Sequence, residues 1–367
     1  MTNPAFNSAT RLMMIAPHPD DESLAAGLLL QRAVATGAAV RIIYATDGDD
    51  NPWPQRILEK RWNLNATDRA RWGKRRRKEA IAALEVLGLG GSNARFLGLP
   101  DQGLTRVLLQ GCQKVSSRIG QMISDWSPTH LLVPSTMDSH PDHSALALLL
   151  HFAADDLGRI QNGCELLCYL VHGDHAKFPC DIVVSPQDDH EVVVKRQAIS
   201  RHWTQVKFSR RRFMAYARRT ERFLLPNHII AAVPMKAVRS AVRAAGELRL
   251  LFRLKSFGME RKAVYLMGHT PSGAPLAVCM QPPGRDARIQ LTDCATSQRI
   301  GIATYRGNSF TGEVTLPAGL FAADRPLFAK VRHHRWFFDE GWTEIPPLPV
   351  EMRAKARPTH QRLLSAA

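Results

Sequence analysis

Short apolar runs alternate with stretches of helical spacing along the first half of the chain. The apolar runs predict strands at 11–16, 40–45, 94–97, 130–134 and 164–171. Apolar positions three or four residues apart predict helices at 24–37, 76–87, 105–125 and 144–155, and one or two more within 187–222. Strands that alternate with helices in this way predict an α/β fold with a doubly wound, mostly parallel sheet.

The pattern changes in the second half of the chain. From about residue 246 on, short β-like runs are separated by turns rich in Gly and Pro, which predicts a smaller all-β, sandwich-like domain. Its last strand is expected at 335–339, with Trp342. Residues 234–245 are interpreted as a short basic amphipathic helix, and residues 51–73 as a long irregular loop over the functional edge of the sheet.

These patterns predict four consecutive parts of the chain. The parts are a first domain at 1–225, a helical linker at 226–245, an all-β accessory domain at 246–345 and a disordered basic tail at 346–367. A chain of 367 residues is long enough for two domains of ordinary size.

Two loops rich in His and Asp follow predicted strands. The run 18–22 reads His-Pro-Asp-Asp-Glu after the first strand, and the run 140–143 reads His-Pro-Asp-His after the strand at 130–134. Loops at the carboxyl ends of neighbouring parallel strands converge at one edge of the sheet. Three consecutive carboxylates repel one another unless a positive charge lies among them, and a divalent metal ion supplies it. The two loops therefore predict a metal site.

Other polar residues near these loops are interpreted as supporting groups. Glu22 is expected to hydrogen-bond behind the metal ligands rather than to bind the ion. His151, His172 and His202 could approach the site but are expected to be structural histidines.

The apolar runs, the first residues and the cysteines bear on where in the cell the protein is expected. No apolar run approaches the ~20 residues of a membrane span, and the first residues lack the pattern of a signal peptide. The six cysteines are scattered, which indicates reduced thiols. A cytoplasmic protein is therefore expected.

The net charge of +16 favours anionic partners. The densest basic run, 69–78, carries no recognisable nucleic-acid motif, so no nucleic-acid partner is expected. The basic helix expected at 234–245 leaves peripheral membrane contact open. The sequence does not indicate the oligomeric state.

The first 220 residues resemble the PIG-L/LmbE-like family of zinc-dependent N-acetylglucosamine deacetylases. The two His/Asp motifs carry most of this resemblance, at the spacing and in the order that the family shows. Further segments that resemble the family lie at 46–48, 76–88, 96–101 and 195–205. The resemblance implies a Rossmann-like deacetylase domain, and it does not extend to the last 120 residues.

The resemblance implies a metal site and a base. His18, Asp21 and His143 correspond to the metal ligands, and Asp20 to the general base. Zinc is the ion expected from the family, while Fe²⁺ or Co²⁺ could occupy a site with the same ligand types.

The resemblance also implies oxyanion and sugar contacts. His140 corresponds to the group beside the developing oxyanion, with Asp142 orienting it, and Arg76 and Asp101 correspond to residues that contact the sugar. Some members carry a tyrosine just before the second motif, where this chain has Asp138. The role of that phenol would be absent here or filled by another group.

The predicted function is a zinc amidohydrolase that removes acetyl from an N-acetylated sugar of the N-acetylglucosamine type, or from its conjugate, and releases acetate. The expected substrate is a small molecule with an anionic group. One alternative is a zinc hydrolase of a different amide, such as a thiol conjugate or an acylated natural product. Another is a basic protein that binds a membrane or polyanion and retains a vestigial site.

Overall fold

The computed structural model describes residues 4–157, 163–225, 237–244, 246–254, 262–333 and 337–348. The chain divides into two compact units, one within residues 1–108 and 114–231, the other within 109–113 and 232–367. Most of the predicted linker and nearly all of the predicted tail lie outside the described residues.

The first unit is built on a mixed sheet whose central strands are parallel. Its strands, in the described part of the chain, are β1 (Arg11–Ala16), β2 (Ala39–Thr46), β3 (Ala94–Leu99), β4 (His130–Pro134), β5 (Glu165–Tyr169), β6 (Ile182–Val184) and β7 (Glu221–Leu224). They lie in the order β3-β2-β1-β4-β5-β7-β6. The pairs from β3 to β5 are parallel, and β7 runs antiparallel to β5 and β6. The mostly parallel α/β sheet is thus confirmed; β6 and β7 were not predicted.

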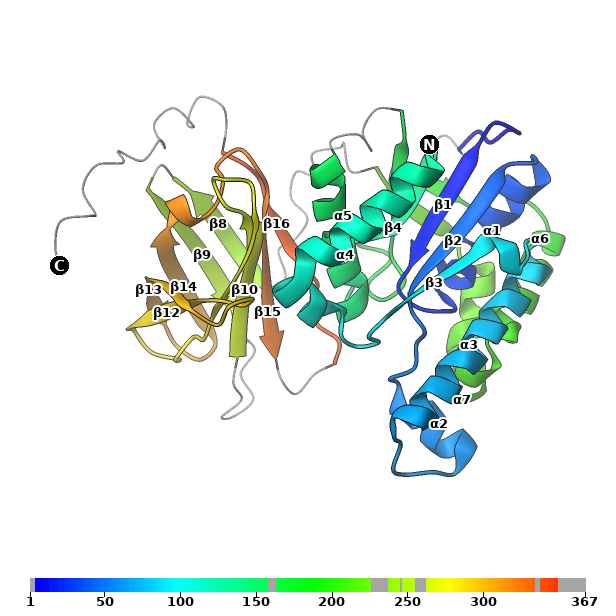
Figure 1. Ribbon diagram of the computed structural model, residues 1–367, viewed down its shortest axis with the longest axis horizontal. Helices are drawn as coiled ribbons and strands as arrows, with labels where there is room; N and C mark the ends of the chain where they lie inside the picture. The colour runs from blue at the N-terminus through cyan, green and yellow to red at the C-terminus, as the bar shows by residue number, and fades with distance from the viewer. Residues whose placement is uncertain are drawn as a thin grey trace. The chain divides into compact units, whose positions relative to one another are not determined.

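Helices cover both faces of this sheet. Their bounds are α1 (Asp21–Ala35), α2 (Pro52–Glu59), α3 (Ala66–Val86), α4 (Leu104–Trp126), α5 (Pro141–Leu157), α6 (Asp189–Arg201) and α7 (Trp203–Ala215), with short 3₁₀ turns η1 (Gly91–Asn93) and η2 (Tyr216–Arg218). Figure 1 shows α4 and α5 on one face and α1, α3 and α6 on the other. A large buried apolar core joins α1, α3 and α6 to the strands. Each described helix is too short or too polar to span a bilayer.

The strand order reverses at β1. From β1 the chain continues to β2 and β3 on one side, whereas β4 and β5 lie on the other side. The loops that follow β1 and β4 therefore leave the same edge of the sheet side by side. Ligands of open α/β sheets bind at such a switch point, and both His/Asp motifs lie there.

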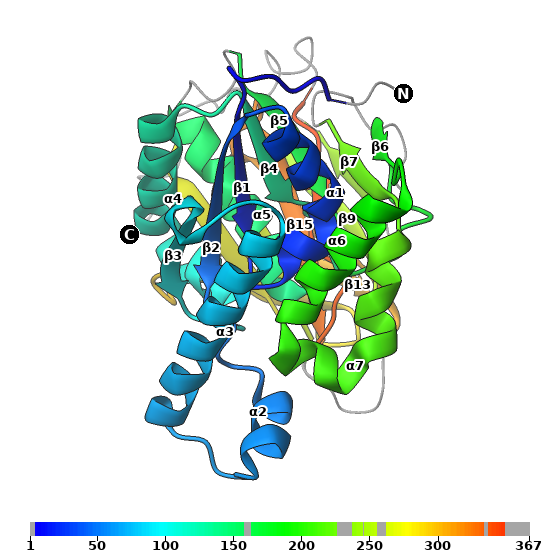
Figure 2. The same cartoon turned by 90° about the vertical axis from the view of Figure 1, so that its right-hand side faces the viewer.

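The prediction of an irregular loop over 51–73 is wrong. Residues 52–59 form α2, and α3 begins at residue 66 rather than 76 (Figure 2). The physical reasons are local. Pro52 occupies the first turn of α2, where its missing N–H costs nothing. Asn65 and Asp68 form a reciprocal capping box that starts α3 ten residues before the predicted position.

The second unit is an antiparallel all-β domain. Its strands, among the described residues, are β8 (Val238–Arg243), β9 (Glu247–Arg253), β10 (Lys262–His269), β11 (Pro275–Met280), β12 (Ala287–Asp293), β13 (Arg299–Gly307), β14 (Thr311–Pro317), β15 (Leu327–His333) and β16 (Thr343–Ile345), with the 3₁₀ turn η3 (Ala318–Leu320). They form one sheet in the order β16-β15-β10-β11-β12-β13-β14-β9-β8. The sheet curls so that β8 and β15 meet, and one apolar core collects side chains from both halves. The all-β character is confirmed, whereas the sandwich arrangement stays a prediction.

Two predictions in this half are wrong. Residues 238–243, expected to be helical, form β8 and pair antiparallel with β9. Pairing with β9 satisfies the backbone groups of this segment, so tertiary contacts override helix propensity. Among the described residues the last strand is β16 at 343–345, after the buried Trp342, and residues 337–342 form no strand. Residues 335 and 336 lie outside the described residues.

Candidate metal centre

The backbone of the first motif turns sharply where β1 passes into α1. Asp20 has φ of 125°, a region that costs a non-glycine residue about 1–3 kcal/mol and that often occurs at functional sites. The Glu22 carboxylate supports the turn by accepting a hydrogen bond from the Asp20 N–H at 3.1 Å. Glu22 also contacts His202 Nε2 at 2.8 Å, so both act as the structural groups that the sequence indicated.

Three ligand-type atoms from the two motifs form a nearly equilateral triangle. His18 Nδ1 lies 3.4 Å from Asp21 Oδ2 and 3.2 Å from His143 Nε2, and His143 Nε2 lies 3.4 Å from Asp21 Oδ2. All three side chains are buried. Ligands held at 2.0–2.1 Å around a tetrahedral zinc ion are separated by about 3.3–3.4 Å. The residues therefore fit a zinc-sized ion in both chemistry and spacing.

Two more histidines border this triangle. The His140 ring lies 4.7 Å from that of His18 and 4.9 Å from that of His143. The His172 ring, from the segment after β5, lies 4.9 Å from that of His143 and 5.3 Å from that of His140. Other donor groups here could hold an ion as well, namely His18-His140-His143, Asp21-His143-His172 and His18-Asp101-Asp142. His172, named from the sequence as able to approach the site but expected to be structural, thus lies at the site.

Asp138 orients His143. Its Oδ2 lies 3.1 Å from His143 Nδ1 and accepts hydrogen bonds from the backbone N–H of Val171 and His172. Burial alone would raise the pKa of Asp138, but the adjacent His143, the nearby His172 and a hydrogen bond from the His140 N–H lower it. A carboxylate on the second ring nitrogen fixes the tautomer that leaves Nε2 free for a metal. The sequence indicated only a missing tyrosine at this position.

Asp101 and Asp142 lie on the other side of His18. His18 Nε2 is 3.2 Å from Asp101 Oδ1 and 3.4 Å from Asp142 Oδ2. The Asp142 carboxylate also accepts from the backbone N–H of Gln102 at 2.7 Å and of Leu104 at 3.0 Å. Burial opposes protonation of His18, yet these carboxylates raise its pKa well above the usual value. Asp142 contacts His140 through its backbone, whose N–H donates to His140 Nδ1 at 3.2 Å.

The Asp20 carboxylate contacts Arg76 on α3. Its Oδ2 accepts from Arg76 Nη2 at 3.1 Å, and Arg76 also donates to the carbonyls of Pro19 and Gly48. Burial raises the pKa of Asp20 to about 6, although Arg76 opposes this shift. Arg76 is only 4% exposed. Gly48 has φ of 63°, and a Cβ there would lie 1.7 Å from Arg76 Nη1, so this contact requires glycine.

The fold and the donor set define the class: an α/β protein with a candidate metal centre at the switch point of its sheet. Residues 13–154 match the model of the family described as PIG-L: GlcNAc-PI de-N-acetylase. The resemblance indicated by the motifs is therefore confirmed for this part of the chain.

Similar proteins are deacetylases by name. The 1D-myo-inositol 2-acetamido-2-deoxy-alpha-D-glucopyranoside deacetylase of Mycobacterium avium (strain 104) is 31% identical over 147 residues, 36% of this chain and 47% of the relative. The enzyme of the same name from Corynebacterium glutamicum (strain R) is 29% identical over 161 residues, 41% of this chain and 54% of the relative. The chain thus spans about half the length of these curated relatives.

Among solved structures, N,N'-diacetylchitobiose deacetylase from Pyrococcus horikoshii is 19% identical. The match covers 61% of this chain and 88% of that one, with a TM-score of 0.47.

Proposed function

We propose that residues 1–225 form a metal-dependent deacetylase domain. Its substrate is an N-acetylated sugar of the N-acetylglucosamine type or a conjugate of such a sugar, and its product is acetate with the free amine. The observation that carries this proposal is the triangle of His18, Asp21 and His143, whose three spacings of 3.2–3.4 Å fit tetrahedral ligands. The family match and the names of the relatives support the choice of an N-acetyl sugar.

In this proposal the three triangle residues hold zinc, and Fe²⁺ or Co²⁺ would suit the same donors. A bound zinc ion would polarise the acetyl carbonyl and lower the pKa of a water molecule. Asp138 keeps the His143 ring in the orientation and tautomer that this requires. The two carboxylates at His18 Nε2 do the same for His18.

Asp20 is the proposed general base. It is not part of the triangle, and its carboxylate accepts a hydrogen bond from Arg76. A carboxylate with a pKa near 6 suits proton transfer close to neutral pH. Asp20 would take the proton from the attacking water and pass it to the nitrogen of the departing amine.

His140 is the proposed oxyanion group. Its ring lies at the partly exposed edge of the triangle, where a carbonyl oxygen could approach. A hydrogen bond from His140 would stabilise the charge that develops on this oxygen. Arg76 and Asp101 form hydrogen bonds with backbone groups of the protein, so their contacts with the sugar stay predictions. The Asp142 carboxylate likewise accepts from the Leu104 N–H, so its role in orienting His140 stays a prediction.

The two neighbouring aspartates test this assignment. Asp20→Asn should retain metal and lose about 10²–10⁴-fold in acetate release, the usual effect of removing a general base. Asp21→Asn should instead lose metal. Metal content by mass spectrometry and acetate release from a panel of N-acetyl sugars measure both effects. Asp174→Asn, at an exposed carboxylate that forms an ion pair with Lys177, serves as the surface control.

The reverse result would contradict the assigned roles: metal lost with Asp20→Asn and kept with Asp21→Asn. Release of acetate from another class of amide alone would favour the alternative hydrolase, and metal binding without any turnover would favour a binding protein. The predicted cytoplasmic location and lack of a nucleic-acid partner stay predictions.

A further inference from the structure

His172 lies beside the candidate metal centre, on the segment that follows β5. Its ring centroid is 4.9 Å from that of His143 and 5.3 Å from that of His140. A ring nitrogen of His172 also lies within 4.8 Å of a ligand-type atom of Asp21 and of one of His143. His172 is therefore close enough to act on a group that is held at the centre.

The backbone of His172 is held by the same carboxylate that holds the ring of His143. Asp138 Oδ2 accepts from the His172 N–H at 3.0 Å and lies 3.1 Å from His143 Nδ1. Asp138 is fully buried, so water does not compete for these contacts. His172 is thus fixed relative to the metal ligand His143, although it lies in an irregular segment.

His172 and His140 form the accessible side of the centre. Both residues are partly exposed, whereas His18 and His143 are buried. A substrate that reaches the metal ligands must therefore pass these two side chains.

Arg212 on α7 determines which nitrogen of His172 carries the proton. Arg212 Nη2 lies 3.1 Å from His172 Nδ1, and a guanidinium group only donates hydrogen bonds. His172 Nδ1 must therefore accept, which leaves the proton of the neutral ring on Nε2. A protonated Nε2 cannot bind a metal ion, but it can donate a hydrogen bond. This contact favours His172 as a donor rather than as a fourth metal ligand.

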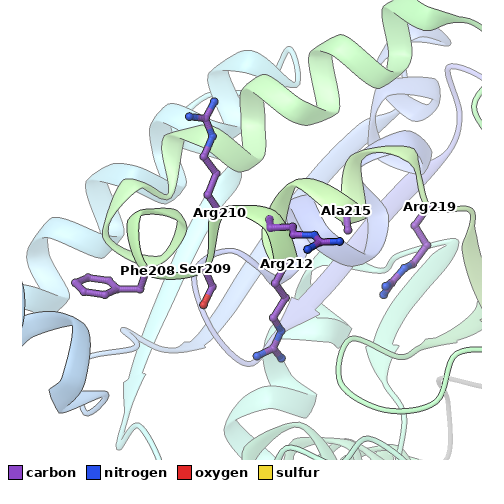
Figure 3. Close-up of a pocket in the computed structure, with 7 residues that line it drawn as sticks. Phe208, Ser209, Arg210, Arg212, Ala215 and Arg219 are labelled. Carbon is purple, nitrogen blue, oxygen red and sulfur yellow. The ribbon is translucent and has the colours of Figure 1, made fainter.

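Arg210, two residues before Arg212, provides a matched comparison. Both arginines are exposed and line the same pocket on α7, where the helix is interrupted at Ser209. Figure 3 shows that they extend towards opposite sides of α7. The same charge can therefore be removed on the side that contacts His172 or on the other side.

We propose that His172 donates a hydrogen bond from Nε2 to the acetyl oxygen of the substrate, as a second donor beside His140. The inference rests on the proposed function and adds two residues to its mechanism. The acetyl oxygen gains negative charge as the amide carbon becomes tetrahedral, and a fixed donor stabilises that charge. Arg212 is a positioning residue, because it acts through His172 by holding Nδ1 and keeping the proton on Nε2.

Substitutions at His172 test the donor in the full-length, zinc-loaded protein. His172→Phe keeps the size of the ring and removes the donor, so kcat for N-acetylglucosamine should fall by about 10²–10³-fold with little change in KM. His172→Gln retains an N–H group near the position of Nε2 and should recover most of this loss. Zinc content should be unchanged in both variants. Loss of zinc from His172→Phe would identify a metal ligand and overturn the inference.

A double-mutant cycle tests the role of Arg212. Arg212→Met frees the His172 ring to take the other tautomer, so kcat should fall by about 10–100-fold, the usual effect of removing a group that orients a histidine. In the His172→Phe background the same substitution should have no further effect. Arg210→Met should leave kcat unchanged. Additive effects of the substitutions at Arg212 and His172 would overturn the positioning role.

Two measurements that need no turnover separate this inference from the proposed function. Heteronuclear NMR of histidine-labelled protein should show the His172 proton on Nε2, and Arg212→Met should abolish this preference. The zinc-loaded protein should bind acetate, and His172→Phe, but not His172→Gln, should weaken this binding by about tenfold or more.

The combined results distinguish the two proposals. Both expected results, with no acetate released from any N-acetyl sugar, would support the donor and contradict the deacetylase. A proton on Nδ1, with acetate binding and turnover unchanged in His172→Phe, would overturn the donor and leave the deacetylase standing.

Discussion

Three consecutive carboxylates, Asp20, Asp21 and Glu22, have three different partners. Asp21 faces the two histidines of the triangle, Asp20 faces Arg76, and Glu22 faces His202. The left-handed backbone of Asp20 separates these directions. Asp20 and Asp21 also differ in pKa. Burial raises the pKa of Asp20 to about 6. Burial would raise the pKa of Asp21 as well, but the adjacent histidines outweigh it and lower this pKa. Neighbours in sequence can therefore hold a metal ion, move a proton and brace the loop.

A prediction at this scale concerns Asp138. Asp138→Asn removes the carboxylate that fixes the His143 ring, so metal affinity should fall by about 10–100-fold. Competition with a fluorescent zinc chelator measures this change. Asp125→Asn on the exposed end of α4, which changes the same charge, serves as control. Unchanged zinc affinity in Asp138→Asn would show that His143 needs no carboxylate partner.

At the scale of elements, a buried ion pair joins the helix that carries Asp21 to the elements behind it. Lys195 on α6 contacts Glu221 on β7 at 2.6 Å, and both are fully buried. The Glu221 carboxylate also accepts from the N–H groups of Leu28 and Leu29 on α1. Gly27 gives the lysine its room, because a Cβ there would lie 3.0 Å from Lys195 Cγ. This contact fixes α1, and with it the first motif, against α6 and β7.

Removal of the lysine should destabilise the fold. Lys195→Met leaves Glu221 as a buried, unpaired carboxylate, which should cost about 3–5 kcal/mol of unfolding free energy at neutral pH. Lys177→Met, which breaks an exposed pair with Asp174, should have little effect. Denaturant unfolding followed by circular dichroism measures both variants.

The loss of unfolding free energy in Lys195→Met should depend on pH. Burial already raises the pKa of Glu221 and Lys195 opposes it, so removing Lys195 raises that pKa further. An acid with a raised folded pKa contributes stability at low pH that is lost as pH rises through the folded pKa. The deficit of Lys195→Met relative to the unsubstituted protein should therefore grow from mildly acidic to neutral pH. A deficit independent of pH would show that Glu221 is not the group responsible.

At the scale of the whole molecule, the chain contains two units with separate apolar cores. The residues proposed to bind metal all lie in the first unit, on the loops after β1 and β4. The net charge of +16 is spread over the chain, and two of its arginines, Arg76 on α3 and Arg212 on α7, lie beside the metal centre.

Removal of the metal should therefore lower the thermal stability of the first unit only. Zinc at 100 times its dissociation constant should stabilise the first unit by ~2.7 kcal/mol, or roughly 5–10 °C in its Tm. Differential scanning calorimetry with and without a chelator should show one transition that shifts and one that does not. A single transition, or two that shift equally, would show that the units unfold together.

The sequence by itself determined the central strands, the main helices and the convergence of the two His/Asp motifs. Apolar periodicity and residue type are local signals, and parallel strands must bring their carboxyl ends to one edge. For the same reason His18, Asp21 and His143 could be named as a group before their spacing was known. The capping box at Asn65 and Asp68 was also a local signal, and it would have indicated the early start of α3.

Only the tertiary structure decided the remaining features. β8 is a strand because β9 offers it backbone partners, which its own composition does not encode. Asp138 and His172 join the site because the chain returns after β5 to place Val171 and His172 on the Asp138 carboxylate. Arg212 on α7 contacts His172, 40 residues away along the chain. Each of these contacts joins two separate segments of the chain, so no local pattern of side chains could indicate it.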